Sequence, residues 1–138
     1  MKLIFFLPMD PPTTTHQMKR VGVSKKGKTI VYEDDRLKDA RQKLTAHLMH
    51  HAPETPADGP LSLHVQWCFA DRQLRHGNGA FKTSKPDTDN LNKLLKDCMT
   101  ACHFWKDDAQ VAVEHIEKRW TRETPGIYIE VAKLYAPK

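Results

Sequence analysis

The segment from Leu61 to Phe69 constrains the fold of this chain more than any other, because apolar and polar side chains alternate along its whole length. Successive side chains of a β-strand point to opposite faces of the sheet, so the alternation predicts a strand with one buried face. The rest of the chain must cover that face. The apolar positions are Leu61, Leu63, Val65, Trp67 and Phe69.

Two other segments have the three- and four-residue apolar spacing of amphipathic helices. The first runs from Asp34 to His51, with acids at its start and histidines at its end, as suits the helix dipole. The second begins at Asp89 or Asn90, one of which we expect to be its N-cap. We expect the two cysteines of its apolar stripe to pack in the core rather than bind zinc. The stripes are Leu37, Ala40, Leu44 and Leu48 in the first helix, and Leu91, Leu94, Leu95, Cys98 and Cys102 in the second.

Short apolar runs at both ends of the chain predict further strands at residues 3–7, 111–120 and 127–134. The Pro125-Gly126 turn between the last two predicts that they form a hairpin. The predicted order is strand, helix, strand, helix, strand, strand. We therefore expect a single α+β domain spanning residues 1–138, with a small mixed β-sheet packed against two main helices.

The chain has a net charge of +5, and many of its cations fall in two segments that we expect to be loops. A basic surface favours contact with a polyanion, although it also serves solubility. Residues 19–32 are predicted to form a flexible basic arm or hairpin, and residues 71–84 a mobile polar loop. The candidate DNA-phosphate contacts are Lys19, Arg20, Lys25, Lys26, Lys28, Arg72, Arg75, Lys82 and Lys85.

Cysteine content and hydropathy bear on where the protein works. The three cysteines lack the spacing of a disulfide framework, which indicates a reducing compartment. No run approaches the roughly 20 apolar residues of a spanning helix. We expect a soluble, cytoplasmic protein that has no membrane partner.

Two short acidic motifs flank the second predicted helix. Asp87 and Asp89 would point to the same side of an extended chain, and a strand that returns beside the helix would bring Asp107 and Asp108 toward them. Converging carboxylates repel unless a cation neutralises them, and an all-oxygen set favours Mg²⁺ or Mn²⁺. Lys93, one helical turn beyond Asp89, could contact a phosphate. This set suits metal-assisted hydrolysis of a phosphodiester.

The same aspartates also fit a purely structural interpretation. Aspartate is common in turns and at helix N-caps, and the spacing alone does not decide between the two interpretations.

The motifs Lys85-Pro-Asp-Thr-Asp-Asn-Leu-Asn-Lys93 and Phe104-Trp-Lys-Asp-Asp-Ala-Gln-Val111, with Asp97 between them, together resemble the signature of the RusA family of Holliday junction resolvases. The early strand and the basic loop are similar to the family in arrangement only. The chain departs from the family pattern in the glycine-containing loop at 75–84, and at His103, where members often carry glycine.

This resemblance implies a Mg²⁺-dependent endodeoxyribonuclease of DNA recombination and repair, often encoded by prophages, that nicks four-way DNA junctions as a homodimer. A two-fold dimer matches a junction with two equivalent strands to cut. The family's catalytic and metal-binding acids fall on Asp87, Asp89 and Asp108, and its essential lysine on Lys93. Supporting roles fall on Asp97 and Asp107.

Three functions therefore compete. The first is the junction-cutting endonuclease. The alternative is a non-catalytic branched-DNA-binding module, against which the intact acids and lysine argue. The third is a nucleotide or small-phosphoester hydrolase with the same metal site, because fold and metal alone do not determine the substrate.

Overall fold

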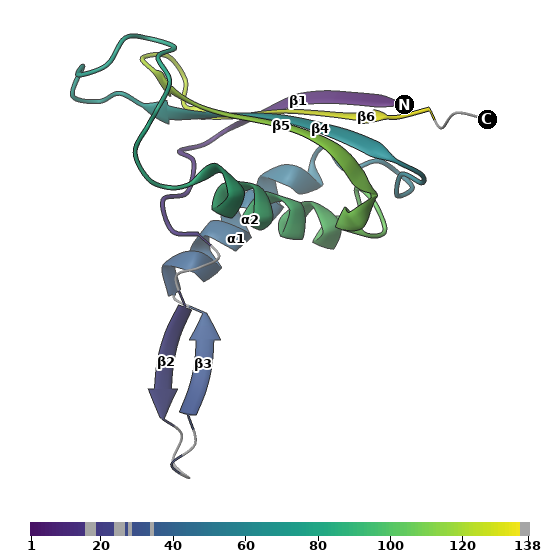
Figure 1. Ribbon diagram of the computed structural model, residues 1–138, viewed down its shortest axis with the longest axis horizontal. Helices are drawn as coiled ribbons and strands as arrows, with labels where there is room; N and C mark the ends of the chain where they lie inside the picture. The colour runs from purple at the N-terminus through teal and green to yellow at the C-terminus, as the bar shows by residue number, and fades with distance from the viewer. Residues whose placement is uncertain (16–18, 24–26, 28, 34, 136–138) are drawn as a thin grey trace.

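The computed structural model describes residues 1–15, 19–23, 27, 29–33 and 35–135, with only the backbone described at 19–23 and 29–33. A four-stranded sheet forms one layer, and two helices lie against one of its faces (Figure 1). The other face of the sheet carries no helix in this view. The predicted mixed sheet packed against two helices is confirmed.

The sheet has the strand order β1-β6-β4-β5. β4 lies in its interior, pairs antiparallel with β6 and pairs parallel with β5. The alternation predicted from Leu61 to Phe69 is confirmed along β4, since every second side chain in this segment is buried. The strands are β1 Lys2–Pro8, β4 Leu61–Ala70, β5 Val111–Thr121 and β6 Gly126–Lys133.

The predicted hairpin between the last two strands is wrong, because β4 lies between β5 and β6. β6 buries Ile127, Ile129 and Val131 and is bordered by a strand on each side, β1 and β4. Gly126 serves a close approach to β1: a Cβ atom there would lie 2.3 Å from the Leu7 carbonyl oxygen. The glycine therefore marks backbone crowding as well as a turn.

The two helices are α1 Asp35–Met49 and α2 Thr88–Ala101. The predicted apolar stripes of both are buried against the sheet, together with Trp67, Phe104 and Trp105. Cys98 packs in this core as predicted, and burial raises the pKa of its thiol to about 11. Cys102 is buried as well.

A separate two-stranded hairpin, β2 Lys19–Val23 with β3 Thr29–Glu33, projects beyond the end of α1 (Figure 1). It confirms the predicted arm. Lys19 and Arg20 lie on β2, whereas Lys25, Lys26 and Lys28 lie outside the described residues. Within the described part of the chain, no helix is long and apolar enough to cross a membrane.

The end of α2 turns the chain toward the second acidic motif. The His103 amide donates to the Thr100 carbonyl at 3.0 Å, and the Phe104 amide donates to the Met99 carbonyl at 3.1 Å. His103 itself has a φ of 62°, in the left-handed region that glycine favours. This pair of bonds is the Schellman pattern of helix ends, which usually places glycine at the left-handed position.

Candidate active site

The second acidic motif forms a tight capped turn at the start of β5. Asp107 is the N-cap of a short 3₁₀ helix, Asp108–Gln110, and its carboxylate accepts from the Ala109 amide at 2.9 Å. The Gln110 side chain accepts from the Asp107 amide at 3.1 Å and donates to the Ala57 carbonyl at 3.0 Å. Asp107 and Gln110 thus hold the turn and leave the Asp108 side chain free of these capping bonds.

The first acidic motif begins α2. Asp87 is the N-cap residue in extended conformation, although its side chain makes no capping hydrogen bond, and Asp89 lies in the first helical turn. The predicted N-cap at Asp89 or Asn90 is therefore wrong. The Leu91 amide already donates to the Asp87 carbonyl at 3.0 Å, so the helix starts two residues earlier than its apolar stripe indicates. The assumption that residues 87–89 are all extended is wrong for the same reason.

Lys93 on α2 approaches the second acidic motif. Its ammonium nitrogen lies 3.2 Å from an Asp97 oxygen and 3.9 Å from Oδ2 of Asp108. Asp89 stands one turn earlier on α2, about 6 Å along the helix axis. The turn at 107–110 therefore places Asp108 beside Lys93 on α2.

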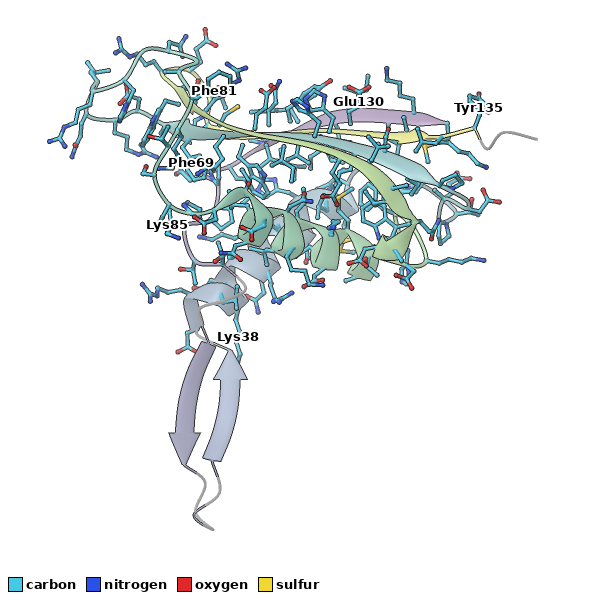
Figure 2. All side chains as sticks on the ribbon, in the orientation of Figure 1. Lys38, Phe69, Phe81, Lys85, Glu130 and Tyr135 are labelled. Carbon is cyan, nitrogen blue, oxygen red and sulfur yellow. The ribbon has the colours of Figure 1, made fainter. Side chains whose placement is uncertain are left out.

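Lys118, on β5, supports the approach to Asp87. Its ammonium group donates to the carbonyl oxygens of Ser84 at 2.8 Å and Pro86 at 2.9 Å. Lys85 points outward at this position and pairs with Asp87 at 2.9 Å (Figure 2). The segment that precedes α2 is thereby tied to the sheet by a side chain from a distant part of the sequence.

The candidate ligands Asp87, Asp89 and Asp108 form no compact cluster in the described chain, where the three-residue group with ligand atoms within 4.8 Å of one another is His64, His115 and Glu117. In the described part of the chain, Asp87 instead pairs with Lys85 at 2.9 Å, and Asp108 lies 3.9 Å from Lys93. The oxygen atoms of the three aspartates are the donor type that Mg²⁺ and Mn²⁺ prefer. The side chains of Asp87 and Asp108 are 46% and 31% exposed, so an ion can reach them. These residues fit such an ion by donor type and access, after reorientation of the lysines.

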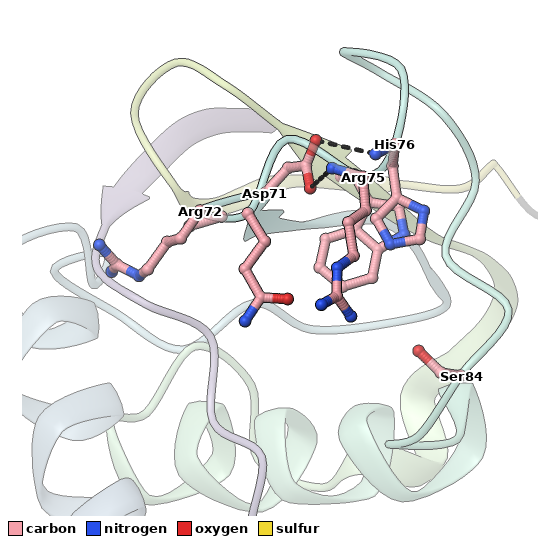
Figure 3. Close-up of a pocket in the computed structure, with 8 residues that line it drawn as sticks. Asp71, Arg72, Arg75, His76 and Ser84 are labelled. Atoms are coloured by element: carbon pink, nitrogen blue, oxygen red, sulfur yellow. Dashed lines mark hydrogen bonds between the residues drawn. The ribbon is translucent and has the colours of Figure 1, made fainter.

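The loop at 71–84 lies beside this site and holds three of the nine predicted basic contacts, Arg72, Arg75 and Lys82. Arg72 and Arg75 line a cavity of about 360 Å³ with His76, Trp120 and Ser84 (Figure 3). Arg72 also forms an ion pair with Asp10 at 2.9 Å. The cavity offers cations and aromatic surface next to the acidic motif.

Lys82 occupies a mixed environment in this loop. Its ammonium lies 4.2 Å from the centre of the Trp120 ring and donates to the Ser84 hydroxyl at 2.7 Å. Burial lowers its pKa, and the neighbouring charge of Lys118 lowers it further. The loop is also tied to the edge of β5, since the Lys82 amide donates to the Lys118 carbonyl at 2.9 Å.

Asp71 organises the start of the same loop. Its carboxylate accepts from the amides of Arg75 and His76, both at 3.1 Å, and from Arg122 at 3.3 Å. Burial alone would raise the pKa of Asp71, but the amide bonds and Arg122 outweigh it and lower the pKa. The carboxylate therefore stays ionised and holds the basic loop in shape.

Sequence reasoning missed three of these supports: Asp71, Gln110 and Lys118. The Asp107 to Gln110 spacing is a recognisable capping box, so Gln110 had a local signal. Asp71 lies two residues after the end of the predicted strand and directly follows β4, a position where a loop-capping aspartate is common. Lys118 had no local signal, because its acceptors lie more than thirty residues away in sequence.

Comparison with known proteins shows the family to which this chain belongs. The family model for Endodeoxyribonuclease RusA matches residues 8–132, most of the chain, so the chain belongs to the RusA family and is an endodeoxyribonuclease. A crossover junction endodeoxyribonuclease rusA from Lactococcus phage r1t is 38% identical over 137 residues, covering 97% of this chain and 100% of the phage protein. The predicted family and the predicted nuclease activity are confirmed, and a phage relative fits the expected prophage origin.

Proposed function

We propose that this chain cuts branched DNA, nicking Holliday junctions in a Mg²⁺-dependent reaction during recombination and repair. The observation that carries the proposal is the 3.9 Å approach of Lys93 to Asp108, because it places the second acidic motif beside the helix that begins with the first. Membership of the endodeoxyribonuclease family supports phosphodiester hydrolysis as the chemistry. The name of the phage relative supports a crossover junction as the substrate.

In this proposal Asp87, Asp89 and Asp108 would hold Mg²⁺, for which Mn²⁺ could substitute. The ion would supply a Lewis acid and a water of lowered pKa at neutral pH. Lys93 supplies the positively charged side chain of the site. Its ammonium group lies near Asp97 and Asp108, and it can turn from these carboxylates to a phosphate oxygen of the DNA. Asp107 keeps the turn closed, so that Asp108 remains beside α2.

DNA binding in this proposal uses the basic loop and the projecting hairpin. Arg72 and Arg75 line a cavity that Ser84 also borders, Lys82 donates to Ser84, and Lys85 pairs with Asp87. Each phosphate that such cations neutralise adds a salt-sensitive increment to affinity. The β2–β3 arm would extend this contact along a second duplex. Two copies related by a two-fold axis would cut both equivalent strands, in the reducing cytoplasm where free thiols persist.

The direct test is Asp89→Asn, assayed for binding and nicking of a synthetic four-way junction in Mg²⁺. We expect near-normal binding and loss of nicking, because the amide cannot replace a carboxylate ligand. Asp58→Asn is the matched control, since Asp58 pairs with Lys133 at 2.6 Å in the loop before β4 and should not affect cleavage. Undiminished nicking by Asp89→Asn would refute the site. Tight junction binding by a wild-type chain that never cuts in Mg²⁺ or Mn²⁺ would instead indicate a binding module.

A further inference from the structure

We infer that the sheet face turned away from the helices carries a second metal site, built from His64, His115 and Glu117, that takes a late first-row divalent cation such as Zn²⁺. The ligand atoms of these three side chains all lie within 4.8 Å of one another. Two imidazoles and one carboxylate differ in kind from the aspartates of the active site. Imidazole nitrogen favours zinc and its neighbours in the first row, whereas Mg²⁺ prefers oxygen.

The register of the sheet brings these residues together. His64 on β4 is the direct partner of His115 on the parallel strand β5, and their ring centroids are 4.5 Å apart. Glu117 follows His115 by two residues and so lies on the same face of β5. Paired strands in the body of the sheet are a firmer support for such a group than a surface loop.

The charges and hydrogen bonds of the cluster suit a cation. Glu117 contacts Nε2 of His115 at 2.8 Å and accepts from Nε of Arg119 at 2.7 Å. Nε2 of His64 is buried and has no hydrogen-bond partner in the described part of the chain. A buried polar atom of this kind calls for an explanation, and a bound cation provides one.

The spacing requires only local adjustment. Zinc–ligand distances of about 2.0–2.1 Å place tetrahedral ligands about 3.3 Å apart, so the side chains would close by at most about 1.5 Å. His115 can supply this movement because its side chain is 60% exposed. Three protein ligands leave a fourth position for water, as in open zinc sites.

This site is separate from the proposed catalytic centre. Glu114, next to His115, pairs with Lys96 of α2 at 2.6 Å, so the alternation of β5 points His115 away from the helices. An ion bound there would tie the edge strand β5 to β4 and would stabilise the folded chain. The inference therefore stands whether or not the acidic site cuts junctions.

The test is two metal titrations of the untagged chain. Zn²⁺ binding is measured by calorimetry in excess Mg²⁺, and Co²⁺ binding is measured by the visible absorption of the bound ion. A Cys68→Ser background removes the one half-buried thiol on this face. We expect one ion per chain and a raised melting temperature. His115→Gln and Glu117→Gln should each weaken binding by more than the about 10- to 100-fold typical of losing an outer-shell partner. His50→Gln, which changes an exposed histidine just beyond α1, should bind like the parent.

The inference is overturned if the parent chain shows no saturable uptake, or if His115→Gln and Glu117→Gln bind Zn²⁺ as tightly as it does. His115 is 60% exposed, and glutamine has nearly the same size and shape as Glu117, so circular dichroism should show both variants folded. Failure of this binding test leaves junction cleavage in Mg²⁺ unaffected, so the two proposals fail separately.

Discussion

Replacing Lys118 by methionine tests how the sheet positions Asp87. The ammonium of Lys118 donates to two backbone carbonyls, those of Ser84 and Pro86, in the segment that leads into α2. Methionine keeps the length of the aliphatic stem and removes both donors. The variant therefore isolates the two hydrogen bonds.

The expected loss in the free energy of unfolding follows from these two hydrogen bonds. Hydrogen bonds to charged groups contribute about 1.5–3 kcal/mol each when buried. Lys118 is only half-buried and Ser84 is exposed, so solvent screening brings each bond to about 1 kcal/mol. We expect Lys118→Met to lower the free energy of unfolding by about 2 kcal/mol. Nicking should fall further than this loss implies, because a displacement of about 1 Å at a catalytic group can cost about 100-fold.

Urea denaturation gives the free energy of unfolding, and single-turnover nicking of a bound four-way junction gives the rate at saturating Mg²⁺. Lys133→Met is the matched control, since its ammonium pairs with the 80% exposed Asp58 carboxylate, away from α2. That change should cost under about 1 kcal/mol and leave the rate unchanged. A Lys118→Met variant with unaltered stability and rate would refute the positioning argument.

Two further predictions concern the end of α2 and the basic loop. His103→Gly should raise the free energy of unfolding by about 0.5–1 kcal/mol, because the residue has a φ of 62°, and His103→Ala should give no such gain; urea denaturation measures both. The pKa of Asp71 is lower in the folded chain than its ordinary value of 3.8. The contribution of Asp71 to the free energy of unfolding is therefore complete above pH 3.8, and it is lost as the pH falls through the pKa of the folded chain. The stability difference between wild type and Asp71→Asn should therefore be constant from pH 7 to about pH 4 and shrink below it; a difference that grows on acidification would contradict the assignment.

The local patterns predicted the elements well. The buried faces of β4, α1 and α2 follow from periodicity, because a side chain's direction repeats every two residues in a strand and about every 3.6 in a helix. Helix boundaries were less predictable. The N-cap at Asp87 was missed because Thr88, Asp89 and Asn90 are polar, so the apolar stripe begins only at Leu91.

The candidate site divides in the same way. The acidic motifs and Lys93 are identifiable from residue type and spacing. The capping box is also recognisable in the sequence, because Asp107 and Gln110 are three residues apart. The position of Asp108 beside α2 depends on how the chain turns after the helix, and from the sequence that return of the strand could only be assumed. The grouping of His64 with His115 had no signal in sequence, since their pairing depends on strand register.

By itself, then, the sequence determined which segments form the main helices and strands, which of their faces are buried, the family, and the residue types of the site, because each depends on a short-range pattern. The tertiary structure alone decided that β4 separates β5 from β6, and that Lys118 holds the chain before Asp87. Sheet order and register join residues that are far apart in the chain, and no local periodicity encodes which strand will be the neighbour of which.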